Sequence, residues 1–169
     1  AEFPEVRRPA CEIWIEPTLE DIDEFFTKYV RTGCDLLSAD IETAGSFITC
    51  LGFAPSRDRA IVIPFHDERA KGGSYWPDRA SEAKAWSLVR DVLIDPRIPK
   101  LFHNGAYDVS FLWRSYGIGV MGCQEDSMLL HHALQPESLK GLGYLGSIYC
   151  DFGPWKSERK FTETIKRDE

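Results

Sequence analysis

The chain has 169 residues, of which 43% are hydrophobic, and this is enough to bury the core of one globular domain. Its formal net charge of −7 disfavours a uniformly basic nucleic-acid surface, so such a role would need local basic patches, bound divalent ions or neighbouring domains. No apolar run approaches the roughly 18 residues of a membrane span, and the N-terminus lacks a signal-peptide core, so we expect a soluble protein with no membrane partner.

The cysteines and the chain ends indicate where the protein works and what surrounds it. Five cysteines, an odd number without a CxxC pair, argue against a disulfide framework or a structural zinc site. We therefore expect a reducing, cytoplasmic compartment. The chain lacks a starting Met and ends in the charged segment KFTETIKRDE without a stop signal, so we expect residues 1–169 to be a single domain excised from a longer polypeptide.

The first half of the chain predicts a strand, a helix and three further strands. Residues 11–16 alternate apolar and polar side chains, and a helix over 17–30 follows, with Thr18 as its N-cap and Asp21 three residues later. Three strand-like runs come next, separated by short breaks, and they predict an antiparallel meander at 35–42, 46–55 and 59–65.

The second half alternates helices with short strands. A polar loop over 66–78 leads to a helix near 81–93, and a strand at 98–104 runs into a helix that Gly117 closes. The remaining segments predict a short strand, a helix and a helical or irregular stretch, at 118–122, 125–134 and 139–150. The order of these elements predicts a mixed five-stranded sheet flanked by helices.

Two acids interrupt the first strand of the meander. Leu36, Leu37 and Ile41 indicate a strand buried on both faces, yet Asp40 and Glu42 share one of those faces because strand side chains alternate. Two bare carboxylates there would repel each other and lose hydration. The pair must be protonated, or lie at the open end of the strand, or hold a cation.

A third acid stands at the start of the helix over 105–117. Asp108 lies in the first turn of this apolar helix, where an acid is also favoured simply by the helix dipole. Together with Asp40 and Glu42 it would form an all-oxygen site, which suits Mg²⁺ or Mn²⁺ rather than zinc. Two divalent ions bridged by carboxylates activate water and stabilise a leaving oxygen, so phosphodiester hydrolysis is the expected reaction.

These residues resemble the first two motifs of the DEDD 3′-5′ exonucleases. The run Asp40-Ile41-Glu42-Thr43 resembles the D-x-E motif, and the later run from Asn104 to Asp108 resembles N-x-x-[YF]-D at a helix start. The segment 125–156 looks like the exonuclease domain of family A DNA polymerases, particularly phage-like ones. The resemblance implies an RNase H-like fold, two divalent cations (Mg²⁺ or Mn²⁺), and proofreading hydrolysis at the 3′ end of single-stranded DNA. A C-terminal polymerase domain of the parent chain would then be its partner in DNA replication.

The resemblance also implies a role for each matching residue. Asp40, Glu42 and Asp108 would be the catalytic metal ligands, with Glu42 also near the attacking water. Thr43 would meet the sugar of the terminal nucleotide through its backbone, whereas Asn104 and Tyr107 would position the phosphate and line the path of the strand. Bland alternatives remain: Thr43 and Asn104 suit turns, and Tyr107 suits a core.

The fourth acid of the family is missing from the sequence. Neither Y-x-x-x-D nor H-x-x-x-x-D occurs, and because this motif would lie beyond the last family-like run, we interpret its absence mainly as truncation. Asp126 or Asp151 could complete the site, although Asp126 is better explained as an N-cap and buried hydrogen-bond acceptor. His131 and His132 are adjacent on a helix and point about 100° apart, so they cannot both bind one ion.

Aromatic and basic side chains offer nucleic-acid contacts. Trp76, in a loop, is the freest candidate for stacking on single-stranded bases, whereas Trp86, Trp113 and Phe102 sit within apolar patterns that predict a core. The C-terminal third is locally basic and suits either phosphate contact or simple solvation, through Lys140, Lys156, Lys160, Lys166, Arg159 and Arg167, and Trp155 lies there too.

Two alternatives to a proofreading exonuclease stay open. The first is a free-standing DEDD exoribonuclease, which the same motifs would serve. The second is an inactive exonuclease-like domain that binds DNA or braces a polymerase, and the missing fourth acid favours it because a metal site without one ligand binds weakly.

Overall fold

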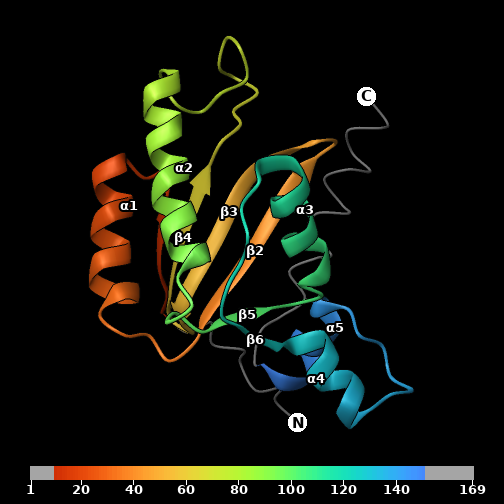
Figure 1. The fold of residues 1–169 in the computed structure, drawn as a ribbon. Helices are drawn as coiled ribbons and strands as arrows, with labels where there is room; N and C mark the ends of the chain where they lie inside the picture. The colour runs from red at the N-terminus through yellow and green to blue at the C-terminus, as the bar shows by residue number, and fades with distance from the viewer. Residues whose placement is uncertain (1–9, 151–169) are drawn as a thin grey trace, which may run out of the picture. The chain divides into compact units, whose positions relative to one another are not determined.

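The computed structural model describes residues 10–150, which fall into two compact units that we treat separately. The larger unit, Cys11–Ser127, carries the sheet and the first three helices (Figure 1). Its elements are β1 (Glu12–Ile15), α1 (Leu19–Phe26), a π-helical turn η1 (Thr27–Arg31), β2 (Leu37–Ala44), β3 (Phe47–Ser56), β4 (Arg59–Pro64), α2 (Arg79–Ile94), β5 (Lys100–Phe102), α3 (Ala106–Tyr116) and β6 (Cys123–Asp126).

The sheet has the order β1-β4-β3-β2-β5-β6. Strands β2, β3 and β4 form the predicted antiparallel meander, whereas β1, β5 and β6 each pair in parallel with a neighbour. The mixed α/β, RNase H-like class is therefore confirmed, with six strands rather than five. The additional member is β1, which lies beside β4 and is held there by the Arg59 to Glu12 ion pair of 2.9 Å.

The last predicted strand is displaced. Residues 118–122 form a connection rather than a strand, and β6 begins at Cys123. The amide of Met121 donates to the carbonyl of Leu93, and Gly122 has φ 68° with its Cα so close to the Ile98 carbonyl that a Cβ would meet it at 2.6 Å. The apolar run is thus used to pack the end of α2, and pairing with β5 follows it.

Helices α1 and α2 lie side by side, and their apolar residues pack in one core with the sheet (Figure 1). Helix α1 begins with the predicted capping box, in which Thr18 and Asp21 bind each other's backbone amides. Strand β2 buries Leu37, Ala39 and Ile41 on one face only, while Asp40 and Glu42 are exposed. The expectation that both faces are buried is therefore wrong, and the acids keep their hydration because they lie on the outer face.

The smaller unit, described over residues 128–150, contains most of α4 (Ser127–Leu134) and all of α5 (Leu142–Tyr149). His131 is buried and its ring nitrogens lie 3.0 Å from the Tyr149 hydroxyl and 2.6 Å from Ser138 Oγ, whereas His132 is exposed. His131 thus ties the two helices together. Each of the five cysteines is a free thiol. No helix within residues 10–150 combines the length and the apolar composition that a bilayer crossing requires.

Candidate active site

The site begins where strand β2 loses its neighbour. Because β5 has only three residues, it pairs with Leu37 and Ser38, and no other strand within residues 10–150 pairs with the rest of that edge of β2. The Ile41 amide, on this open edge, donates to Asp108 Oδ1 at 3.1 Å. One hydrogen bond therefore joins the strand of Asp40 and Glu42 to the first turn of α3, which are far apart in sequence.

The connection from β5 to α3 explains how Asp108 reaches that edge. Asn104 has φ 62°, a left-handed conformation that asparagine tolerates better than most residues, and Gly105 cannot be replaced because a Cβ would lie 2.5 Å from Phe102 Cβ. The Asp126 carboxylate accepts from the amides of Asn104 at 3.1 Å and Gly105 at 2.8 Å. The prediction that Asp126 is a hydrogen-bond acceptor is confirmed, and its donors lie at the start of α3.

A bulge and a hydroxyl pair shape the outer end of β2. Glu42 pairs with Cys50 and Thr43 with Ile48, so Thr49 is the extra residue of a β-bulge, and its Oγ1 donates to the Glu42 carbonyl at 3.0 Å. Beyond the bulge, Thr43 Oγ1 and the Tyr107 hydroxyl lie 2.8 Å apart. Tyr107 is 50% exposed, so the core alternative for its ring is wrong.

Asp108 is the most perturbed acid of the site. Its side chain is 4% exposed, and this burial, together with the nearby charge of Asp40, raises its pKa to about 6 against the opposing hydrogen bond from the Ile41 amide. Asp126 adds a smaller repulsion. The negative charges of Asp40 and Asp126 therefore lie close enough to the buried carboxyl of Asp108 to disfavour its ionised form.

The donor chemistry can be tested against a divalent cation. The candidate ligands are all carboxylate oxygens, which hard cations prefer, and the repulsion between Asp40 and Asp108 is one that a cation would relieve. In the described part of the chain, however, no three His, Cys, Asp or Glu side chains gather closely enough to hold a metal ion. The residues present fit a cation held by one or two carboxylates, as Mg²⁺ commonly is, rather than a closed protein cage.

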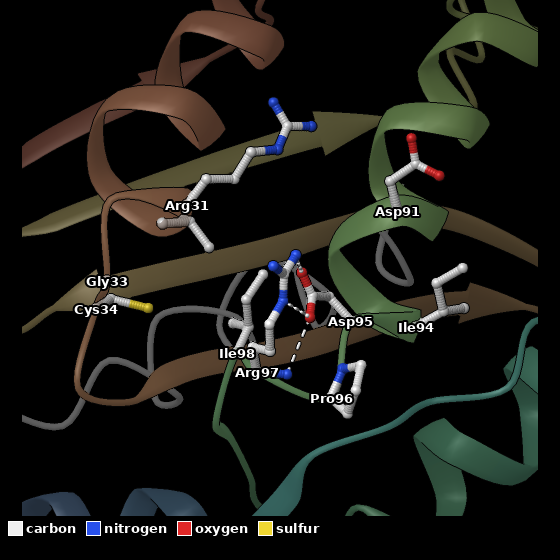
Figure 2. Close-up of a pocket in the computed structure, with 10 residues that line it drawn as sticks. Arg31, Gly33, Cys34, Asp91, Ile94, Asp95, Pro96, Arg97 and Ile98 are labelled. Carbon is white, nitrogen blue, oxygen red and sulfur yellow. Dashed lines mark hydrogen bonds and ion pairs between the residues drawn. The ribbon is translucent and has the colours of Figure 1, made fainter.

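Two pockets in the larger unit differ in position. A pocket of about 820 Å³ lies where η1 and α2 end and β2 and β5 begin, with Arg31, Cys34, Asp95 and Arg97 around it (Figure 2). None of the candidate acids lines it. A smaller one of about 400 Å³ borders the site itself, lined by Asn104, Ala106, Tyr107, Ser110, Phe111, Arg114 and Ser115.

The structure reverses two expectations about tryptophans. Trp76 is only 7% exposed and packs against Phe65 and Tyr75, so the stacking prediction for it is wrong. Trp113 is 64% exposed, and its core assignment is wrong because Asp108 and Leu112 define the buried side of α3. Phe102 is buried as predicted, and Trp86 is half-buried against Phe65. Trp155, Asp151 and all the basic candidates except Lys140 lie outside the described residues.

Two residues that support the site, Thr49 and Ser127, have no recognisable signature in the sequence. Thr49 gave no signal beyond strand propensity, although a bulge beside two acids is a common way to re-aim a side chain. Ser127 Oγ lies 2.9 Å from His103 Nδ1 and donates to the Phe102 carbonyl, so it braces the same connection as Asp126. His103 and Ser127 are separated by helix α3 and strand β6, and no sequence pattern links them.

The mixed six-stranded sheet, in which an antiparallel meander is flanked by parallel strands, defines an RNase H-like α/β domain. A family model described as 3′-5′ exonuclease matches residues 18–165, and the chain belongs to this family. No curated protein sequence matches the chain.

Three solved structures illustrate the likeness of fold. NrnC from Brucella melitensis superposes with a TM-score of 0.57 at 18% identity, over 85% of this chain and 62% of that one. The catalytic core of RRP6 from Trypanosoma brucei gives 0.63 at 16% identity, over 90% and 38%, and an EXD2 exonuclease domain gives 0.52 at 19%, over 78% and 65%. At these identities the likeness concerns the fold, and this chain spans less than two thirds of each of the three.

Proposed function

We propose that this 3′-5′ exonuclease domain removes terminal nucleotides from single-stranded DNA with the help of two divalent cations, as the proofreading part of a DNA polymerase. The observation that carries the proposal is the hydrogen bond from the Ile41 amide to Asp108. It brings the two acidic motifs of a chain in this family to one open strand edge, with a buried, charge-crowded carboxyl between them.

The acids Asp40, Glu42 and Asp108 would hold the cations. Bound Mg²⁺ or Mn²⁺ would supply an activated water and offset charge on the phosphate. The EXD2 exonuclease domain, of the same fold, was soaked in Mn with GMP and in Mg with dGMP, which supports this choice of ions. Because Mg²⁺ usually keeps waters and substrate phosphates among its ligands, an incomplete set of carboxylate ligands is compatible with binding of this ion.

The protein's own groups would orient the strand end. Thr43, next to the bulge, would meet the terminal sugar through its backbone, and the Tyr107 hydroxyl, 2.8 Å from Thr43 Oγ1, would contact the phosphate. Asn104 would line the path of the strand from its left-handed position. The buried carboxyl of Asp108 would be held in place by the Ile41 amide, so its orientation does not depend on the substrate.

We propose that Asp126 is not the fourth acid of the site. Asp126 already binds two amides of the Asn104–Gly105 peptide region, which leaves it a supporting position rather than a catalytic one. A site with three acids would bind its cations weakly and cleave slowly, so the isolated domain is expected to be less active than a chain that includes the missing ligand.

The test uses 5′-labelled single-stranded DNA with Mg²⁺ or Mn²⁺, compared between this chain, an Asp40→Ala variant and a version extended past Glu169. A ladder shortening from the 3′ end, fastest in the extended protein and absent from the variant, is the expected result. If neither intact version shortens the strand while both still bind it, the domain is an inactive DNA-binding module and the proposal is wrong.

RNA is the second candidate substrate. The EXD2 exonuclease domain was soaked with GMP in one case and with dGMP in another, so both sugars are worth testing on this chain. Matched DNA and RNA strands in the same assay separate the two: faster shortening of RNA would indicate a free-standing exoribonuclease rather than a proofreading domain.

A further inference from the structure

The outer side of α3 is an unusual surface for an acidic protein. Its buried side holds Asp108 and Leu112, while Tyr107, Ser110 and Arg114 are exposed at positions i, i+3 and i+7 and therefore lie along one stripe. The pocket of about 400 Å³ follows this stripe. It joins aromatic, hydroxyl and guanidinium groups in one concave surface that starts at the catalytic motif.

Arg114 differs from several other arginines of the larger unit. Arg59, Arg69 and Arg97 each hold a carboxylate within 3.1 Å. Arg114, in contrast, forms no ion pair with any side chain in the part of the chain that the structure describes, and it is exposed. An arginine held in a pocket without a carboxylate partner is suited to bind a phosphate, to which its fork of donors is matched.

The aromatic rings complete a nucleotide-sized surface. The ring centroids of Tyr107 and Phe111 lie 5.9 Å apart at an interplanar angle of 38°, and both rings line the pocket. Single-stranded nucleic acid is commonly bound by such rings together with a cation that follows the backbone. At about 1.5 Å rise per residue, Arg114 stands roughly 10 Å along the helix from Tyr107, a distance suited to a phosphate beyond the scissile one.

We propose that this pocket binds the substrate strand upstream of the cleaved linkage, with the penultimate base against Tyr107 and Phe111 and the next phosphate on Arg114. The inference rests on the proposed exonuclease function, since it names how the same site takes the rest of its strand. It makes Arg114 a determinant of the preference for an oligonucleotide over a single nucleotide ester.

The kinetic test compares two substrates. Decathymidylate fills the upstream pocket, whereas the p-nitrophenyl ester of thymidine 5′-monophosphate has one phosphodiester and no upstream nucleotide. Arg114→Gln is expected to lower kcat/KM for decathymidylate about tenfold, with the loss confined to that substrate. Arg90→Gln, on the exposed side of α2, is the matched control and is expected to change neither rate. Equal losses on both substrates would overturn the inference.

A binding test separates failure of the subsite from failure of the exonuclease function. The affinity for fluorescein-labelled decathymidylate is measured in EDTA at several salt concentrations. Removing one phosphate contact from a single strand lowers the slope of log affinity against log salt by about 0.7, so Arg114→Gln should show this change, and Arg114→Lys and Arg90→Gln should not. If the protein cleaves neither substrate but Arg114→Gln still changes the salt slope, the subsite proposal is supported and the exonuclease proposal is wrong. If the salt slope of Arg114→Gln equals that of the wild type, the subsite proposal is wrong, whatever the cleavage rates are.

Discussion

Two pockets of the larger unit, the one of about 820 Å³ at the ends of η1 and α2 and the one of about 400 Å³ along α3, differ in the charged groups around them. In the larger one, Asp95 binds Arg97 through both carboxylate oxygens, at 2.9 and 2.7 Å, as Figure 2 shows. Lys100, fully buried nearby, donates to the carbonyls of Asp95 and Ile98. Beside the smaller pocket, Asp108 is buried next to like charges, and Arg114 is held without a carboxylate in the described residues.

This difference is consistent with the proposal that the catalytic site lies at the edge of β2 and not at the larger pocket. A region whose ionic groups already satisfy one another gains little from a charged ligand, because binding must first break those contacts. A region with repelling carboxylates gains stability when a cation arrives. Volume alone would select the larger pocket, whereas charge balance selects the edge of β2.

The largest expected effect is on catalysis, and it separates the two pockets directly. Asp40→Asn should lower exonuclease activity by at least about 100-fold, since in the proposed site it removes a charge that would hold the cation. Asp91→Asn, which changes an exposed acid that lines the larger pocket, should leave the activity within about twofold. The rates are measured on 5′-labelled single-stranded DNA. Comparable losses in both variants would mean that overall charge, not the edge of β2, controls the reaction.

The second prediction concerns the pH dependence of stability. The folded-state pKa of Asp108, about 6, lies above the roughly 3.9 of an unfolded aspartate. Below pH 4 the carboxyl is protonated in both states, so no charge is buried and folding carries no electrostatic cost. Stability is lost as the pH rises from 4 to 6, and the full cost of about 2 to 3 kcal/mol persists above that. In EDTA, Asp108→Asn should therefore be more stable than the wild type at pH 8, with the gain vanishing near pH 4.

Urea denaturation at the two pH values measures this difference. The Asn side chain keeps an oxygen that accepts from the Ile41 amide, so the comparison isolates the charge. Asp91→Asn serves as the exposed control, with no pH-dependent gain expected. If the difference in free energy of unfolding between Asp108→Asn and the wild type is the same at pH 8 and at pH 4, the charge of Asp108 does not destabilise the folded protein, and the prediction is wrong.

The third prediction applies to the balanced pocket. Lys100→Met removes the donor to two carbonyls and should reduce the free energy of unfolding by about 2 kcal/mol, because buried carbonyls without partners are costly. Burial lowers the pKa of Lys100 because a buried ammonium loses its hydration. The Met variant avoids this cost, which offsets part of the loss in stability. Lys84→Met, on the exposed side of α2, should change stability by less than about 0.5 kcal/mol. Urea denaturation at pH 7 measures both, and a more stable Lys100→Met protein would contradict the prediction.

The contrast between the pockets also explains what the sequence could predict. The meander, the capping box at Thr18 and the end of α3 at Gly117 follow from local patterns, and all three are present. The acids at 40, 42 and 108 were selected because charge in an apolar setting is conspicuous. The position of Asp108 on the Ile41 amide depends on the short length of β5, which no periodicity encodes.

Errors occurred where a residue's environment is set by distant elements. Trp76 was expected to be free because it lies in a polar loop, yet Phe65 and Tyr75 bury it. Trp113 was expected in the core because its sequence neighbours are apolar, but it faces outward from α3. The prediction of a strand at 118–122 was wrong for the same reason, because the Met121 amide bonds to the Leu93 carbonyl at the end of α2.

The smallest predicted effect tests the hydroxyl pair at the edge of the site. Tyr107→Phe removes the group that meets Thr43 Oγ1 but keeps the ring in the pocket, so it loses one hydrogen bond and no stacking surface. One partly exposed hydrogen bond contributes about 0.5 to 1.5 kcal/mol, which corresponds to a loss of about twofold to tenfold in kcat/KM. Tyr29→Phe, in η1, is the matched control, with no change expected. If Tyr107→Phe cleaves at the wild-type rate while Tyr107→Ala is impaired, the ring and not the hydroxyl positions the strand. Tyr107 would then act through the pocket on α3 and not through its contact with Thr43 on β2.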